Sequence, residues 1–158
     1  MLVYTNKLPL YLQHQIMKTS ESKYCKCLYF TTNALARKVE KLALESWKPV
    51  DLSPSHAYLL LMVLEEPGTQ PSCIANHLQL SPSTVTRLIE KLEERKLVIR
   101  TSEGKQTNVY PSAAAKEMLP ILNKCLTHFY NNYSTILGKE ESCKLITNMS
   151  LVADKISL

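Results

Sequence analysis

The chain has 158 residues, of which 45% are hydrophobic and 21% are charged, a balance typical of a globular protein and not of a disordered one. Its three glycines indicate few tight turns and favour a mostly helical fold. The formal net charge of +5 fits a polyanionic partner without requiring one, because many proteins of other classes are equally basic.

Membrane association and an oxidising compartment are both disfavoured. The longest apolar run, 57–64, is far shorter than the roughly 20 residues of a membrane helix. The N-terminus lacks the charged, apolar and small-residue regions of a secretion signal. Five cysteines without regular spacing agree with reduced thiols. We therefore expect a cytoplasmic protein with no membrane partner.

Residues 1–19 show no clear period, but a helical pattern follows them. From about Ser20, apolar and small residues recur at steps of three and four, which predicts one long helix. This helix should end near Trp47, because Pro49 cannot continue it. The face consists of Cys25, Leu28, Tyr29, Thr32, Leu35, Ala36, Val39 and Ala43.

Two later helices begin with the same signal, a serine cap followed by proline at the first helical position. Ser53-Pro54 predicts a helix from Ser55 to about Glu65, apolar nearly all round and therefore buried. Ser81-Pro82 predicts a helix from Ser83 to about Lys96. The second helix is amphipathic, with Val85, Leu88, Ile89 and Leu92 on its apolar face.

A short helix starting at Pro71 or Ser72 precedes the amphipathic one across a tight turn. Two helices joined in this way form the layout of a helix-turn-helix. Strand-like residues follow at 97–100 and 107–110, on either side of a turn at 102–105. This hairpin stands directly after the second helix, where a winged helix has its wing.

The C-terminal part predicts a long helix at 112–137 and a last amphipathic helix at 139–156. Pro120 should kink the first of these or delay its start. Its expected inward residues are Met118, Leu122, Cys125, Phe129 and Ile136. The predicted fold is thus mostly α with a small β-hairpin wing. It comprises an N-terminal arm and helix (1–50), a winged helix-turn-helix lobe (51–112) and C-terminal helices (113–158).

The exposed side of the helix at 81–96 indicates DNA binding. An arginine there can pair with guanine O6 and N7, and small hydroxyls allow close approach to bases or phosphates. The free N–H groups at the helix start suit a phosphate. The alternative interpretation is an ordinary solvated helix face. The predicted DNA contacts are Ser81, Ser83, Thr84, Thr86, Arg87 and Lys91 on the helix, with Arg100 and Lys105 on the hairpin.

The segment from Leu52 to Arg100 resembles the MarR family of winged-helix regulators. Leu78, Ser81, the run 83–88 and Leu92 match the family signature LxxSxSTVTRLxxxL, and the resemblance extends over about residues 20–137. It implies a homodimer held by long N- and C-terminal helices and bound to a pseudo-palindromic site on double-stranded DNA. It also implies a repressor that a small ligand or an oxidant releases from DNA.

Two departures from the family concern the DNA-binding lobe. Lys96 stands where the family usually has glycine, and the hairpin lacks the family's Asp-x-Arg motif. Lys105 is the only basic residue at the hairpin tip, and Arg100 lies at its base. We therefore expect reading mainly through the major groove, with the hairpin as a modest phosphate contact. The alternative is a winged-helix protein-interaction module without sequence-specific DNA binding.

Cys25 and Tyr29 match the four-residue spacing of the peroxide-sensing branch of the family. On a helix this spacing brings a hydroxyl near a thiol, so the pair is a candidate redox sensor beside the simpler interpretation of Cys25 as a core residue. The four histidines show no metal-ligand spacing, and the sequence contains no catalytic set or phosphate-binding glycine loop. We expect no metal, no cofactor and no enzymatic activity.

Overall fold

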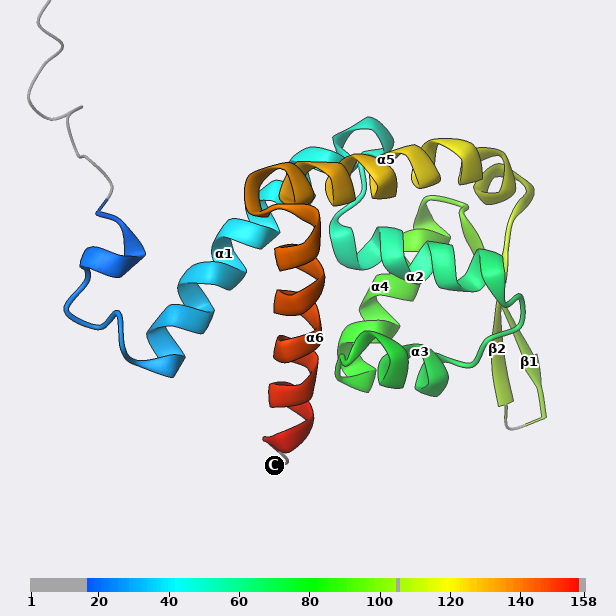
Figure 1. Ribbon diagram of the computed structural model, residues 1–158. Coiled ribbons are helices and arrows are strands. Elements are labelled where there is room, and N and C mark those ends of the chain that lie inside the picture. The colour runs from blue at the N-terminus through cyan, green and yellow to red at the C-terminus, as the bar shows by residue number, and fades with distance from the viewer. Residues whose placement is uncertain (1–16, 105, 157–158) are drawn as a thin grey trace, which may run out of the picture. The chain divides into compact units, whose positions relative to one another are not determined.

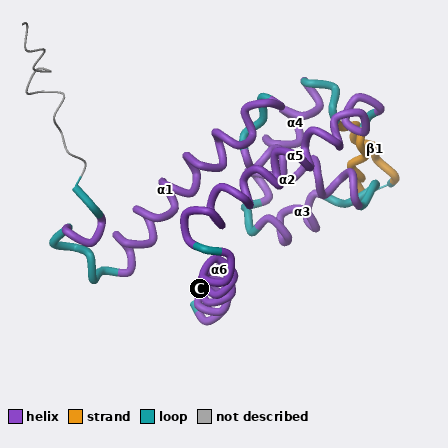
Figure 2. The backbone as a smooth tube through the Cα atoms, turned by 45° about the horizontal axis from the view of Figure 1, so that its top comes forward, coloured by secondary structure: helices purple, strands orange, loops and turns teal. Residues whose placement is uncertain are grey.

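The computed structural model describes residues 17–104 and 106–156 and is helical apart from one antiparallel hairpin (Figures 1 and 2). The predicted mostly α fold with a β-hairpin wing is confirmed. By its internal contacts the chain divides into two units, Met1–Val39 and Glu40–Leu158. The elements are η2 (Thr19–Glu21), α1 (Leu28–Trp47), η3 (Lys48–Val50), α2 (Pro54–Glu65), α3 (Pro71–Leu78), α4 (Pro82–Glu94), β1 (Val98–Glu103), β2 (Gln106–Pro111), α5 (Ala113–Leu137) and α6 (Lys139–Lys155).

The first helix starts later than its sequence pattern predicts. Its expected start near Ser20 is wrong, because the described chain forms η2 and then turns before α1 begins at Leu28. Ser22 Oγ accepts a hydrogen bond from the backbone N of Tyr24 at 3.2 Å. Such local side-chain bonds give the backbone an alternative to the helix.

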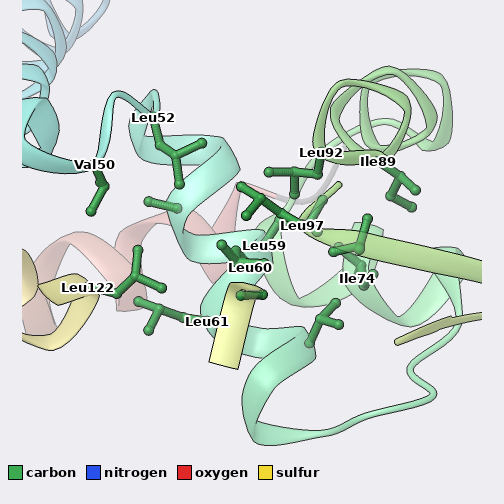
Figure 3. Packing of buried hydrophobic residues seen from close by; sticks show 14 of the residues in the cluster. Val50, Leu52, Leu59, Leu60, Leu61, Ile74, Ile89, Leu92, Leu97 and Leu122 are labelled. Atoms are coloured by element: carbon green, nitrogen blue, oxygen red, sulfur yellow. The ribbon is translucent and has the colours of Figure 1, made fainter. Parts of the chain in front are cut away.

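The core of the second unit is built around α2, which is apolar on nearly all sides as its sequence predicts. Leu59, Leu60 and Val63 are fully buried. α5 packs along one side of α2, and α3, α4 and β2 pack on its other sides. Figure 3 shows side chains from these elements meeting around α2, including Ile74 of α3, Ile89 and Leu92 of α4 and Leu122 of α5. This packing fixes α4 with one face buried.

Three serines cap helices in this unit, and the sequence predicts two of them, Ser53 and Ser81. Ser53 Oγ accepts from the backbone N of His56 at 3.5 Å, and Ser81 Oγ accepts from that of Thr84 at 3.2 Å. Ser112 caps α5 in the same way. A cap of this kind stabilises a helix by about 1 kcal/mol, because it satisfies an N–H that has no partner within the helix.

The C-terminal helices bury less apolar surface than expected. Leu122 and Cys125 are buried as predicted, but Ile136 is 71% exposed, so its predicted inward position is wrong for the single chain. Pro120 lies inside α5 and does not delay its start at Ala113. Further exposed apolar residues lie on or just after α6, namely Leu145, Ile146, Met149, Leu151, Val152 and Ile156. None of the described helices is long and apolar enough to cross a membrane.

Candidate nucleic-acid interface

The start of α4 presents a row of hydroxyl groups. Ser81 Oγ lies 3.0 Å from Ser83 Oγ and 2.8 Å from Thr84 Oγ1, so the three hydroxyls share hydrogen bonds. Thr86 Oγ1 donates to the carbonyl of Pro82 at 3.0 Å. All these side chains are exposed. The first turn therefore offers small acceptors and free N–H groups to a partner without a bulky side chain in the way.

Arg87 is the cation of this exposed face. Val85, Ile89 and Leu92 are buried on the opposite side of α4, which holds the guanidinium outward. Within the part of the chain that the structure describes, no carboxylate forms an ion pair with Arg87. Its charge and five donors therefore remain available to an external acceptor.

Two of the other predicted basic contacts, Lys91 and Arg100, form ion pairs within the protein. Lys91 Nζ lies 2.6 Å from Glu94 Oε2, one turn along α4. Arg100 Nη2 lies 2.5 Å from Glu93 Oε2, and the backbone N of Arg100 donates to Glu93 Oε1 at 3.2 Å. Lys105 lies outside the described residues. Of the predicted basic contacts that the structure describes, Arg87 alone has no ion pair with a described residue.

The hairpin is fastened at its base to the turn between α2 and α3. β1 pairs with β2 in antiparallel register, and Thr69 forms a bridge with Val109 on the other side of β2. The backbone N of Gly68 donates to Val109 O at 2.9 Å, and that of Val109 donates to Thr69 O at 3.1 Å. Tyr110 lies against Gly68. These bonds fix the direction in which the hairpin leaves the lobe.

A helix-turn-helix of α3 and α4 followed by this hairpin is a winged helix, and residues 50–106 match the model of the MarR family. This lobe is similar to that of the MarR family. It is 27% identical over 82 residues to the HTH-type transcriptional repressor MdtR of Bacillus subtilis, an alignment that covers 52% of this chain. The alignment spans about half of that relative, 53% of its length.

Solved MarR-type structures share the fold over most of the chain. The repressor CouR bound to a 23-mer DNA duplex superposes with a TM-score of 0.75 at 20% identity, covering 87% of this chain and 98% of that one. CouR bound to p-coumaroyl-CoA gives the same score and identity, covering 86% and 98%. The MepR–DNA complex of S. aureus gives 0.72 at 16% identity, covering 82% and 98%. At these identities the likeness shows the fold.

The end of α4 keeps the geometry of a glycine cap although the residue there is Lys96. Lys96 has a φ of 58°, in the left-handed region. Its backbone N donates to Glu93 O at 2.8 Å, and that of Leu97 donates to Leu92 O at 2.8 Å. Both bonds are those of a Schellman motif. A residue other than glycine accepts this conformation at a cost of about 1 kcal/mol.

His56 connects the start of α2 with the end of α4. Its Nδ1 lies 2.7 Å from Ser53 Oγ, and its Nε2 is buried with no hydrogen-bond partner among the described residues. Burial lowers the pKa of His56 below its ordinary 6.5, and the positive charges of Arg95 and Lys91 lower it further. Protonation would leave a buried N–H⁺ without an acceptor next to two cations.

We expect the free energy of unfolding to fall on acidification because of His56. The unfolded state binds this proton near pH 6.5, whereas the folded state binds it only at lower pH. The stabilisation by neutral His56 is therefore complete above pH 6.5 and is lost as the pH falls through the lowered pKa of His56 in the folded state. Urea unfolding of wild type and H56Q between neutral pH and about pH 5 measures it. An equal pH dependence in both proteins would contradict this role.

Cys25 and Tyr29 do not lie on one helix. Cys25 is half-buried in the turn that precedes α1, whereas Tyr29 is 69% exposed in the first turn of α1. The Tyr29 ring contacts Phe30 edge to face, with ring centroids 5.2 Å apart, and Tyr24 stacks on the same Phe30. The helical spacing argument for a thiol–hydroxyl pair therefore fails, although a redox role of Cys25 stays a prediction.

Sequence reasoning missed three residues that position the interface. The sequence pattern does not predict that Glu93 binds Arg100 at the base of the hairpin. The pattern also does not predict that Tyr110 lies against Gly68. A family alignment could have marked the pairing of positions 93 and 100. No signal within the single sequence connects Gly68 with Tyr110.

Proposed function

We propose that this protein is a DNA-binding transcriptional regulator of the cytoplasm, most simply a repressor, that reads its operator with α4. The observation on which this rests is the exposed hydroxyl face at the start of α4, where Arg87 has no ion pair with any residue that the structure describes. Arginine and small hydroxyls at a helix N-terminus are suited to base edges and phosphates of the major groove. CouR and MepR, which share the fold, are described in complex with DNA.

The proposed DNA contacts differ in whether their side chains are free to bind DNA or are already held in ion pairs. Ser81, Ser83, Thr84, Thr86 and Arg87 are exposed and directed away from the core. Lys91 and Arg100 can reach a phosphate only by giving up Glu94 or Glu93, which lowers the gain from each contact. Lys105 stays a proposal from the sequence.

We propose a homodimer as the form that binds DNA. The second unit leaves apolar side chains of α6 and the end of α5 in solvent, with Ile136 at 71%, Leu151 at 54% and Ile156 at 54%. Exposed apolar residues that gather on two consecutive helices mark an interaction surface. A two-fold dimer would place two copies of α4 against a pseudo-palindromic operator.

A recess between α2 and α5 is the proposed site of a small releasing ligand. Its volume is about 330 Å³, and it is lined by Tyr58, Leu126, Thr127, Phe129, Tyr130 and Tyr133. Burial raises the pKa of Tyr58 and of Tyr133, so both hydroxyls stay protonated. Aromatic walls with a few hydroxyls suit a planar ligand, and CouR is described with p-coumaroyl-CoA. Release by an oxidant is the other proposal, tested by peroxide on wild type and C25S.

The alternative function is a winged-helix module that binds a protein and not DNA. The ion pairs of Lys91 with Glu94 and of Arg100 with Glu93 favour this alternative, because they neutralise positive charge at the surface of α4 and the hairpin. Binding of the wild-type protein to selected operator DNA across salt concentrations distinguishes the two functions. DNA binding must weaken steeply with salt, and a regulator must bind as two chains per duplex. Absence of any salt-dependent, sequence-selective complex would support the interaction module.

A further inference from the structure

A second recess lies between the last turn of α1, the start of η3 and α5, and it shares no lining residue with the aromatic recess. Its volume is about 460 Å³, within the range of roughly 300–1,000 Å³ that is typical of small-molecule sites. We call it the α5 recess. Its lining residues are Ser46, Pro49, Ile121, Lys124, Cys125 and His128.

Ser46 and Cys125 are the two buried residues of the α5 recess, and both are neutral. Ser46 is 1% exposed, and its Oγ donates to Leu42 O at 2.9 Å. Cys125 is 3% exposed, and burial raises the pKa of its thiol, so the thiol stays protonated. Pro49 and Ile121 contribute aliphatic surface. These four residues suit the hydrocarbon part of a ligand.

The positive charge of the α5 recess comes from Lys124. Among the described residues, no carboxylate forms an ion pair with Lys124. The sequence has no acidic residue from 118 to 138, so α5 itself supplies no competing acceptor near it. His128 lies one helical turn from Lys124 and faces the same recess.

His128 is oriented by a neighbouring amide. Asn132 Nδ2 lies 3.1 Å from His128 Nε2 and 3.5 Å from Ser46 Oγ. An amide N–H donates, so Nε2 of the neutral ring accepts and Nδ1 has the proton. Lys124 and His128 therefore supply N–H donors at one place beside aliphatic surface.

We propose that the α5 recess binds a small aliphatic monocarboxylate, with the carboxylate at Lys124 and His128 and the hydrocarbon chain against Pro49 and Ile121. One ammonium and one imidazole match a single negative charge better than a phosphate dianion, which needs more donors. Apart from the His128 ring, the lining residues of the α5 recess are not aromatic, in contrast to the tyrosine-lined recess, so a flexible chain fits it better than an aromatic ring.

The test uses the full-length protein without DNA and the pair hexanoate and hexanamide, which differ in charge. Binding is followed by calorimetry and by the ring resonances of His128, assigned with H128Q. We expect hexanoate to bind and to shift these resonances, and hexanamide to bind at least about fivefold more weakly. K124M should weaken hexanoate binding to a similar degree. K116M, a substitution of an exposed lysine of the same helix outside the recess, should not change it.

Three results would overturn the proposal: equal affinity for hexanoate and hexanamide, equal affinity of K124M and K116M, or hexanoate shifts at Tyr133 in place of His128. If K124M fails to fold, I121W, which fills the recess from its partly exposed wall, replaces it and must block binding. No DNA enters the experiment, so its failure leaves the proposed regulatory function standing, and failure of DNA binding leaves this site standing.

Discussion

Replacing Arg87 by alanine is expected to weaken operator binding by about 1–3 kcal/mol, roughly 5- to 150-fold in Kd. Arg87 is exposed on α4, next to Thr86 and opposite the buried Ile89. It has no intramolecular ion pair among the described residues, so alanine removes an external contact without leaving a carboxylate unpaired. Filter binding with operator and with unrelated DNA, each across a salt series, measures the change.

The salt series also identifies what Arg87 touches. If Arg87 contacts a base edge, R87A should lose more affinity for the operator than for unrelated DNA, and its salt slope should stay nearly unchanged. If Arg87 contacts a phosphate, R87A should bind both DNAs more weakly, and its salt slope should be smaller by about one. K91A is the comparison variant and should weaken binding less than R87A, because Lys91 lies one turn further along α4 and is already paired with Glu94. Unchanged affinity and slope for R87A would refute the assignment.

The helix starts of the DNA-binding lobe could be predicted because their signals are local. Ser53 and Ser81 each bond a backbone N–H three residues ahead, and a proline follows each of them. A cap, a proline and an apolar period lie within one window of sequence, so they can be recognised without knowledge of the fold. The hairpin was predictable for the same reason.

The exposure of the C-terminal helices was not predictable, because a periodic pattern shows which face is apolar and not what covers it. Leu122 and Cys125 pack against the lobe, whereas Ile136 lies on the same helix in solvent. Which residues of α5 are buried depends on which of them lie beside the rest of the lobe, and no pattern within α5 shows this. The start of α1 was mispredicted for a related reason, since turns and η2 occupy residues that have helical spacing.

Contacts between distant residues form the part of the site that the sequence left open. Arg95 donates to the carbonyls of Asp51 and Val50, more than forty residues earlier in the chain. Glu93 and Arg100 are nearer in sequence but belong to a helix and a strand. These pairs fix the end of α4 against the end of η3 and against the hairpin, and they depend on the packed fold.

Replacing Gly68 by alanine is expected to lower the free energy of unfolding by about 1–3 kcal/mol and to weaken DNA binding as well. Gly68 has a φ of 91°, which side chains other than glycine rarely adopt. A Cβ there would lie 3.1 Å from Tyr110 Oη, so the ring at the base of the hairpin must move. The backbone of Gly68 also bonds Val109, so the strain reaches β2 directly. Urea unfolding and operator binding of the variant measure the two effects.

The comparison with G138A separates the backbone strain from the contact with Tyr110. Gly138 has a nearly equal φ of 86°, but a Cβ there meets no atom within 4 Å. Both variants should therefore lose a similar stability from the backbone, and only G68A should lose more and displace the hairpin. A tyrosine that shifts should change the ring resonances of Tyr110 in G68A and leave them unchanged in G138A. If the two variants unfold at the same urea concentration and bind DNA equally, the contact of Tyr110 with Gly68 does not hold the hairpin. The backbone bonds of residues 68 and 69 with Val109 then determine its direction.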